Sequence, residues 1–223
     1  MHSYFDKATL VAKLKLTMVV SQAEAAPRSV FELAELAFEG GVTALQLREK
    51  HLGDRDFYDL AKKLADFCRE RGKAFIVNDR LDLALAVRAD GVHLGQKDLP
   101  ARVASQIMVA KGLGPKPILG VSVSTVMEAM AAKEARADYL GVGPMVNTLS
   151  KVGAQVVDSG QVRPILSTGL VTVAIGGIGP NNAADYWTKG FNCLAAISAF
   201  TKSADPAQTA RDMMVGAPKS IGW

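Results

Sequence analysis

Short apolar runs alternate with longer amphipathic stretches along most of the chain. Several runs are rich in β-branched residues and flanked by glycine, which is typical of strands buried on both faces of a parallel sheet. The runs that predict strands are Leu14–Val20, Val42–Leu47, Ala74–Val77, Gly91–Leu94, Ile118–Ser122, Tyr139–Val142, Val171–Ile175 and Cys193–Ile197.

The stretches between these runs repeat apolar residues at about the 3.6-residue period of an α-helix. Several end at glycine, a common helix stop. The predicted helices are Val30–Phe38, Phe57–Cys68, Leu81–Val87, Val123–Ala135 and Asn182–Lys189. Beyond Lys151 the pattern weakens, because Gly153, Gly160 and Pro164 interrupt any long helix. We expect an irregular loop there, followed by a short helix over Val162–Ser167.

Strand–helix units in this number predict an all-parallel sheet, because parallel strands need crossover connections. Eight units within 223 residues favour closure into a (β/α)₈ TIM barrel, with an open doubly wound sheet as the alternative. No linker or low-complexity segment divides the chain, so residues 1–223 are predicted to form a single domain. Candidate chemistry is therefore sought where the strands end.

Composition narrows the function classes. The chain is 49% hydrophobic and 22% charged, with a net charge of +4, and its Lys and Arg residues are scattered. A nucleic-acid-binding protein would show a basic stripe, so no nucleic-acid partner is expected. No membrane partner is expected either, because no apolar stretch approaches the ~18 residues of a membrane span. Met1–Lys15 does not resemble a signal peptide, which predicts a cytoplasmic location. Cys68 and Cys193 are predicted to be buried free thiols.

Polar side chains follow the second predicted strand. In Gln46-Leu-Arg-Glu-Lys50 the strand alternation places Gln46, Arg48 and Lys50 on one side. Buried polar groups are costly unless they meet a partner, and an Arg–Lys pair suits a pyrophosphate. A solvated strand exit with local ion pairs is the alternative.

Two aspartates follow neighbouring predicted strands. Asp79 comes after the third strand and Asp98 after the fourth. Both carboxylates would reach the same end of a barrel, where Mg²⁺ commonly binds one or two carboxylates together with substrate phosphates. The alternative for Asp79 is a cap of the following helix. His93 lies inside the fourth strand, where a hydrogen-bonded core histidine is favoured over a general base.

Hydroxyls and glycines follow the later strands. Ser122 ends the fifth strand and is a candidate ligand contact, whereas Ser124 or Thr125 could cap the next helix. The polar loop after the sixth strand carries hydroxyls and Lys151, as an anion-binding loop would. Gly176-Gly177 follows the seventh strand and Ala196-Ile-Ser-Ala199 the eighth, where barrels often bind phosphate through backbone N–H groups.

In this order the motifs resemble the thiamine phosphate synthase family. The resemblance runs from about Val42 to Pro206. Its most specific parts are Gln46-Leu-Arg-Glu-Lys50, Val77-Asn-Asp79, Gly91-Val-His-Leu-Gly-Gln-Lys-Asp98, Ala174-Ile-Gly-Gly-Ile178, and Ile197-Ser-Ala199 with Asp205-Pro206.

The resemblance implies an enzyme that joins 4-amino-5-hydroxymethyl-2-methylpyrimidine pyrophosphate to 4-methyl-5-(2-hydroxyethyl)thiazole phosphate. It implies a dissociative substitution in which Arg48, Lys50 and Lys151 stabilise the departing pyrophosphate. By position, the resemblance implies that the pyrimidine pyrophosphate is bound by Gln46, Arg48, Lys50 and Asn78, and that Mg²⁺ is bound by Asp79 and Asp98. It implies that the substrate or the pyrophosphate is contacted by Ser122 and Lys151. It implies that the thiazole phosphate is bound by Thr148, Ser150, Gly177, Ile197 and Ser198.

The chain departs from the family pattern in several places. The loop after the sixth strand usually reads close to Gly-Pro-Ile-Phe-Pro-Thr-x-Thr-Lys, whereas this chain has Gly143-Pro-Met-Val-Asn-Thr-Leu-Ser-Lys151. We expect weaker preorganisation of the loop rather than lost chemistry. Ser124 stands where the family often has His, residues 152–161 do not match the usual continuation, and the first strand lacks the common aromatic start.

Three alternative functions stay open. Thiazole tautomerases share the scaffold but tend to lose the second aspartate and keep the histidine, the reverse of Asp98 and Ser124 here. A non-catalytic barrel that binds thiamine precursors becomes plausible if the altered loop cannot close. Another phosphate-handling barrel, such as an isomerase, ranks third, because no acid–base pair is evident. The sequence leaves the oligomeric state, including a homo-oligomer, open.

Overall fold

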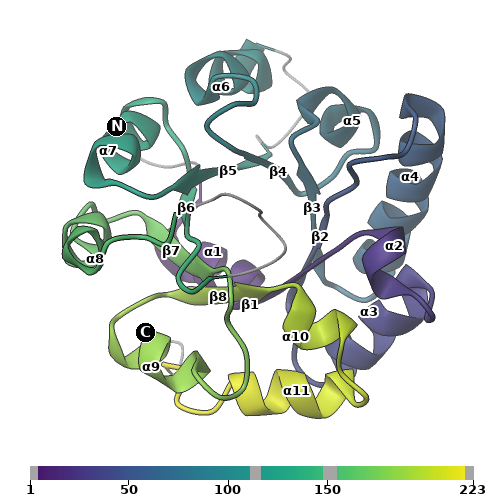
Figure 1. Cartoon of the computed structure of the whole chain (residues 1–223). Helices are drawn as coiled ribbons and strands as arrows, with labels where there is room; N and C mark the ends of the chain where they lie inside the picture. Colours follow the sequence, from purple (N-terminus) through teal and green to yellow (C-terminus); the bar gives the residue numbers. More distant parts are fainter. Residues whose placement is uncertain (1–4, 111–116, 148–154, 219–223) are drawn as a thin grey trace.

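Parallel strands form a closed barrel in the computed structural model, which describes residues 5–110, 117–147 and 155–218 (Figure 1). Within these ranges each strand pairs with the next in sequence, and β1 pairs with β8. The strands are β1 Leu16–Val20, β2 Ala44–Leu47, β3 Ala74–Asn78, β4 Gly91–Leu94, β5 Ile118–Val123, β6 Tyr139–Val142, β7 Val171–Ile175 and β8 Cys193–Ala196. The closed order confirms the predicted TIM barrel and excludes the doubly wound sheet.

Helices surround the barrel. They are α1 Lys7–Leu14, α2 Gln22–Ala25, α3 Val30–Glu39, α4 Asp54–Glu70, α5 Leu81–Ala86, α6 Ala101–Ala110, α7 Val126–Glu134, α8 Ser159–Leu166, α9 Ala183–Thr188, α10 Ser198–Thr201 and α11 Pro206–Met213. No helix within the described ranges combines the length and the apolar character needed to cross a membrane.

Several predicted boundaries differ from the structure by a few residues, and the differences at the first strand and at α8 have a clear cause. The first strand begins at Leu16 rather than Leu14, because Leu14 is the last residue of α1. The helix predicted over Val162–Ser167 begins earlier, at Ser159. The Asp158 carboxylate accepts a hydrogen bond from the Gly160 N–H and so caps this helix start, which the glycine was expected to prevent.

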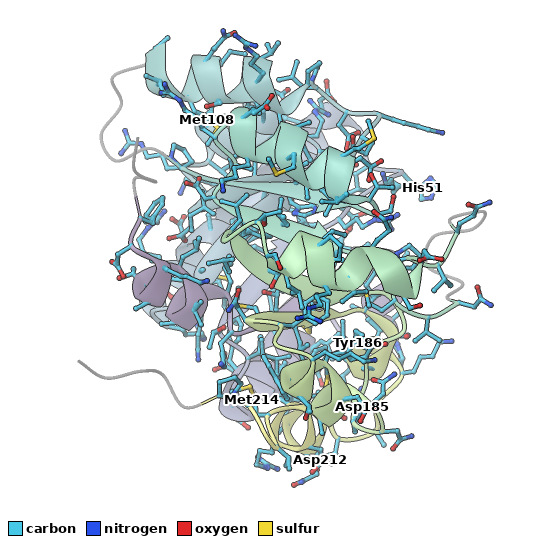
Figure 2. The ribbon with its side chains drawn as sticks, turned by 90° about the vertical axis from the view of Figure 1, so that its left-hand side faces the viewer. His51, Met108, Asp185, Tyr186, Asp212 and Met214 are labelled. Atoms are coloured by element: carbon cyan, nitrogen blue, oxygen red, sulfur yellow. The ribbon has the colours of Figure 1, made fainter. Side chains whose placement is uncertain are left out.

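Two apolar layers make up the core. Side chains that alternate inward along the strands fill the barrel itself, among them Val19, Ile76 and Tyr139, and α1 closes this layer with Leu10 and Leu14. Side chains of the opposite parity pack between the strands and the outer helices. In side view His51 lies at the right-hand edge, where the strands end, whereas the purple helix α1 lies at the opposite edge (Figure 2).

Polar residues secure the end of the barrel where the strands begin. The residue before each even-numbered strand accepts a hydrogen bond from a backbone N–H of the preceding odd-numbered strand. The donor–acceptor pairs are Leu16 N to Thr43 Oγ1 (3.1 Å), Phe75 N to Asp90 Oδ2 (3.0 Å), Leu119 N to Asp138 Oδ2 (2.8 Å) and Thr172 N to Asn192 Oδ1 (3.0 Å). These hydrogen bonds satisfy backbone N–H groups at the end of the barrel where the strands begin. This end therefore contributes to stability, and the candidate chemistry is sought at the other end.

Candidate active site

A cavity of about 530 Å³ opens at the end of the barrel where the strands finish. Every strand, or the residue just beyond it, contributes to its lining. The contributors in strand order are Val19, Gln46, Asn78, His93, Ser122, Gly141, Ile175 and Ile197. The position agrees with the general rule for parallel barrels.

The exit of β2 supplies the cationic side of the cavity. Gln46 is buried, and the side chains of Arg48 and Lys50 line the cavity with it. Between them, Leu47 points into the core and the Glu49 carboxylate accepts a hydrogen bond from the Gln22 N–H. The alternation predicted from the sequence is therefore present in the structure.

Asp79 faces the cavity from an unusual backbone position. Its φ is +65°, and the Arg80 N–H donates to the Asn78 carbonyl across it at 2.8 Å, which makes a γ-turn of the rarer hand. The carboxylate pairs with the Lys50 ammonium at 2.8 Å. Helix α5 has Arg80 as its N-cap residue, with no side-chain cap bond. The alternative that Asp79 caps this helix is therefore wrong.

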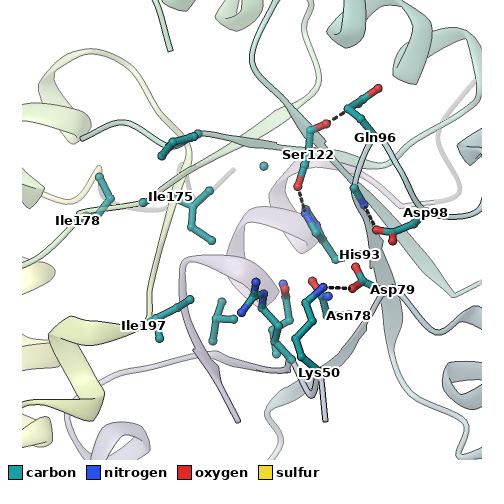
Figure 3. A pocket seen from close by; sticks show the side chains of 18 of the residues that line it. Lys50, Asn78, Asp79, His93, Gln96, Asp98, Ser122, Ile175, Ile178 and Ile197 are labelled. Atoms are coloured by element: carbon teal, nitrogen blue, oxygen red, sulfur yellow. Dashed lines mark hydrogen bonds and ion pairs between the residues drawn. The ribbon is translucent and has the colours of Figure 1, made fainter. Parts of the chain in front are cut away.

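Asp98 lies beside Asp79 at the same rim (Figure 3). Its Oδ2 accepts the Gly95 N–H at 2.6 Å, so the segment after β4 folds back around the carboxylate. Burial raises the pKa of the Asp98 carboxyl, and the neighbouring Asp79 carboxylate raises this pKa further. Two carboxylates held this close repel each other unless a proton or a cation lies between or beside them.

His93 is a buried, hydrogen-bonded histidine, as predicted. Its Nδ1 lies 2.9 Å from Tyr139 Oη and its Nε2 lies 2.8 Å from Ser122 Oγ. Ser122 lines the cavity, whereas Thr125 caps α7 and Ser124 bonds to the Glu128 carboxylate of that helix. Of the three hydroxyls at the end of β5 and just beyond it, Ser122 is thus the one that lines the cavity.

The turns after β7 and β8 form the opposite wall. Gly176 and Gly177 have φ of +91° and +75°, a region that glycine adopts without strain. A Cβ on Gly177 would lie 2.7 Å from the Val146 side chain, so the turn packs closely against the preceding loop. Ser198 begins α10, where the first N–H groups have no partner within the helix.

The chain matches the family model described as thiamine monophosphate synthase over residues 16–200. It belongs to this family. The chain is 43% identical over 198 residues to the thiamine-phosphate synthase of Moorella thermoacetica, which covers 88% of this chain and 92% of that one. It is 42% identical over 200 residues to the thiamine-phosphate synthase of Coprothermobacter proteolyticus, with coverage of 89% and 92%.

Solved structures agree with this assignment to the thiamine monophosphate synthase family. Thiamine phosphate pyrophosphorylase from Pyrococcus furiosus is 36% identical, has a TM-score of 0.83, and the match covers 96% of this chain and 100% of that one. A 3-hexulose-6-phosphate synthase is similar at a TM-score of 0.66 but only 16% identical, so it shows the barrel fold alone. Because the named relatives are synthases, the tautomerase and isomerase alternatives are not favoured.

Most of the residues expected from the family resemblance lie together. The cavity is lined by Gln46, Arg48, Lys50, Asn78, Asp79, Asp98, Ser122, Gly177, Ile197 and Ser198. Thr148, Ser150 and Lys151 lie outside the described residues.

Sequence reasoning missed two polar lining residues and most of the apolar wall. Gln96 and Lys97 line the cavity, and Gln96 Nε2 donates to the Ser122 carbonyl at 2.6 Å. Their position directly between Gly95 and Asp98, after a strand end, could have identified them. Ile175 and Ile178 line the cavity as well, and nothing in their sequence setting separates them from core residues.

Proposed function

We propose that the chain joins 4-amino-5-hydroxymethyl-2-methylpyrimidine pyrophosphate to 4-methyl-5-(2-hydroxyethyl)thiazole phosphate, releasing pyrophosphate and forming thiamine phosphate. This makes it a transferase that acts on small phosphorylated substrates. The observation that carries the proposal is one cavity with two differently built sides: charged side chains that follow β2, β3 and β4, and glycine-rich backbone after β7 together with the start of α10 after β8.

The charged side suits the pyrimidine pyrophosphate. Arg48 provides a planar fork of N–H donors and Lys50 a compact positive charge, both appropriate for a pyrophosphate. Buried Gln46 and Asn78 provide amide groups that can read the polar edge of a pyrimidine ring. We assign Ser122 to the same substrate, and Lys151 to the leaving pyrophosphate.

The carboxylate pair fits a magnesium ion. Asp79 and Asp98 offer hard oxygen donors. Burial raises the pKa of the Asp98 carboxyl first, the neighbouring Asp79 carboxylate raises it further, and a divalent cation would relieve the repulsion between the two. Across the described ranges no group of three or more His, Cys, Asp or Glu side chains is arranged to hold a metal. The pair would therefore share the ion with phosphate oxygens and water. When bound, Mg²⁺ would neutralise charge on the pyrophosphate.

The backbone side suits the thiazole phosphate. The Gly176–Gly177 turn brings the main chain to the cavity without a Cβ, and the first N–H groups of α10 lie next to it. N–H groups without an intrahelical partner at a helix start favour an anion. We assign Gly177, Ile197 and Ser198 to this phosphate, together with Thr148 and Ser150.

The arrangement fits a dissociative substitution. The bond between the pyrimidine methylene carbon and the pyrophosphate oxygen breaks, and Arg48, Lys50 and Lys151 stabilise the charge on the leaving group. The methylene cation is stabilised by the ring amino group, and the thiazole nitrogen then attacks it. Ile175 and Ile178 provide apolar surface beside the reacting centre, which limits capture of the cation by water. The protein's task is to hold the two partners in line.

The test is thiamine phosphate formation from the two purified substrates, with Mg²⁺ or with a chelator. We expect product only with the metal. Asp79→Asn and Asp98→Asn should each remove most activity without lowering the melting temperature, and raised Mg²⁺ should partly restore it. Asp185→Asn, at an exposed site on α9 (Figure 2), is the matched control. Full activity in both cavity variants would refute the metal assignment.

A second outcome would overturn the enzyme assignment itself. If both substrates bind, as measured by calorimetry, and no product forms, the altered loop after β6 has cost the chemistry and a precursor-binding protein is the better description. The cytoplasmic location and a homo-oligomer stay predictions.

A further inference from the structure

Below Ser122, a chain of hydrogen bonds leads into the interior of the barrel. Tyr139 Oη lies 2.9 Å from His93 Nδ1, and His93 Nε2 lies 2.8 Å from Ser122 Oγ. Tyr139 is 3% exposed and His93 is 7% exposed. His93 and Ser122 both line the cavity, whereas Tyr139 does not, and Gln96 lies next to Ser122 (Figure 3).

Strand register and two glycines make room for this chain of contacts. Gly120 is paired with His93 on one side and with Tyr139 on the other, and Ser122 is paired with Gly141. A Cβ on Gly120 would lie 2.2 Å from the Tyr139 ring, and a Cβ on Gly141 would lie 2.7 Å from His93 Cε1. The Tyr139 side chain thus passes over Gly120 to reach His93, and the His93 ring lies against Gly141.

For a neutral His93 ring, two proton arrangements satisfy these distances. In the first, Tyr139 donates to Nδ1, Nε2–H donates to Ser122, and the serine proton is left to point into the cavity. In the second, Nδ1–H donates to Tyr139 and Ser122 donates to Nε2, so the Tyr139 proton needs another acceptor. The described residues place no other acceptor within bonding distance of Tyr139 Oη, and a buried donor without an acceptor is costly. Burial also raises the pKa of the Tyr139 phenol, which therefore keeps its proton.

We propose that Tyr139 and His93 are positioning residues, which hold Ser122 as a hydrogen-bond donor directed at an anionic substrate oxygen. The Tyr139 hydroxyl fixes His93 as the Nε2–H tautomer, and Nε2–H occupies a lone pair of the serine oxygen. The Gln96 side-chain amide restrains the same serine by donating a hydrogen bond to the Ser122 main-chain carbonyl. A donor prepared in this way suits the pyrophosphate of the pyrimidine substrate. The identity of that anion rests on the proposed function, whereas the tautomer does not.

The tautomer can be measured without any substrate. Nitrogen-15 NMR distinguishes the N–H nitrogen of a histidine ring from the bare one, and the chain has three histidines, so the loss of one signal set in His93→Gln assigns His93. We expect hydrogen on Nε2 in the unmodified protein and a mixture of tautomers in Tyr139→Phe. Hydrogen on Nδ1 in the unmodified protein would overturn the proposal.

A double-mutant cycle in kcat/KM tests whether Tyr139 and His93 act through Ser122. Loss of one hydrogen bond predicts that Tyr139→Phe lowers kcat/KM for the pyrimidine pyrophosphate roughly tenfold. In a Ser122→Ala background the same change should have an effect of less than about twofold, because the positioned group is gone. Tyr186→Phe, a buried tyrosine on α9 away from the cavity, should leave kcat/KM unchanged.

The outcomes separate the two proposals. A tenfold loss from Tyr139→Phe in both backgrounds would mean that the tyrosine is only structural. If the chain forms no thiamine phosphate at all, the proposed function fails, and the nitrogen-15 measurement still decides the tautomer. If product forms and Nδ1 carries the hydrogen, only the positioning role is lost.

Discussion

A methyl group at position 120 should disrupt the interior of the barrel, because the Tyr139 ring occupies that space. Gly120 lies within β5, and an added Cβ would lie 2.2 Å from Tyr139 Cζ and 2.5 Å from its Oη. Carbon atoms in contact prefer about 3.5–4.0 Å, so the ring would have to move by more than an ångström. Its neighbours in the interior layer, among them Ile118 and Val173, are themselves buried, which leaves it little space to move into.

The cost follows from overpacking. Extra groups in a close-packed core cost typically ~1–3 kcal/mol, and an overlap this deep belongs at the upper end. Replacing glycine also restricts the unfolded chain, which offsets ~0.4–1 kcal/mol. The net expectation for Gly120→Ala is a loss of about 2 kcal/mol, which lowers the melting temperature by roughly 4–8 °C for a chain of this size.

Thermal and urea unfolding of four proteins test this reasoning: the unmodified chain, Gly120→Ala, Tyr139→Val and the double variant. Valine has no atoms where the added Cβ meets the tyrosine ring. In the Tyr139→Val background, Gly120→Ala should therefore leave the free energy of unfolding unchanged or raise it slightly. The coupling energy between the two substitutions is then about 2 kcal/mol. Gly53→Ala is the control, because a Cβ there meets no atom within 4 Å. If Gly120→Ala costs the same with and without the tyrosine ring, the packing argument is wrong.

Three further predictions concern other parts of the molecule. Lys50→Met should raise the KM for the pyrimidine pyrophosphate about tenfold or more. It should change the free energy of unfolding by less than ~1 kcal/mol, because the ion pair between Lys50 and Asp79 is partly exposed. Equal effects on both substrates in steady-state kinetics would contradict the assignment of Lys50. Asn192→Ala removes the acceptor of the Thr172 N–H and hydroxyl, so urea unfolding should show a loss of ~1–3 kcal/mol with kcat/KM unchanged, and a large kinetic effect would refute the separation of the two barrel ends. Burial raises the pKa of the Cys68 and Cys193 thiols to about 12, against a usual value near 9; the folded chain should therefore react with a thiol reagent at pH 8 only after denaturant is added, and the free energy of unfolding should decrease as the pH rises above about 9, since only the unfolded thiols ionise there.

The strands were predictable because each is a short apolar run with a clear beginning and end. Helix α6 was missed because its buried face consists only of Ala104, Ser105 and Met108, while Val103 and Val109 are exposed and obscure the period. Helix α1 was missed for a related reason, since Leu10 and Leu14 are its only buried positions. One pair spaced by four residues is a weak periodic signal among charged neighbours.

The site residues that follow from the side-chain alternation of a single strand could be predicted from the sequence. The contacts that depend on the pairing register between neighbouring strands could not. Gln46, Arg48 and Lys50 follow from the two-residue repeat of one strand. The hydrogen-bonded chain below Ser122 instead requires that Gly120 lie between His93 and Tyr139, a relation among three strands. Along the sequence Tyr139 resembles any aromatic core residue. The γ-turn that aims Asp79 at Lys50 is likewise a backbone conformation that no spacing rule specifies.

The interior of the barrel connects its two differently built ends. At the end where the strands begin, polar side chains are satisfied by backbone N–H groups, which gives stability and little reactivity. At the other end, burial and the neighbouring Asp79 carboxylate raise the pKa of the Asp98 carboxyl, so these two side chains are held close together at a cost to the fold, as is typical of functional sites. Tyr139 packs in the same interior layer as Leu10 and Leu14 of α1. The tyrosine whose hydroxyl bonds to His93 therefore belongs to the apolar layer that α1 closes, which links the packing of the closed end to the hydrogen bonds below Ser122.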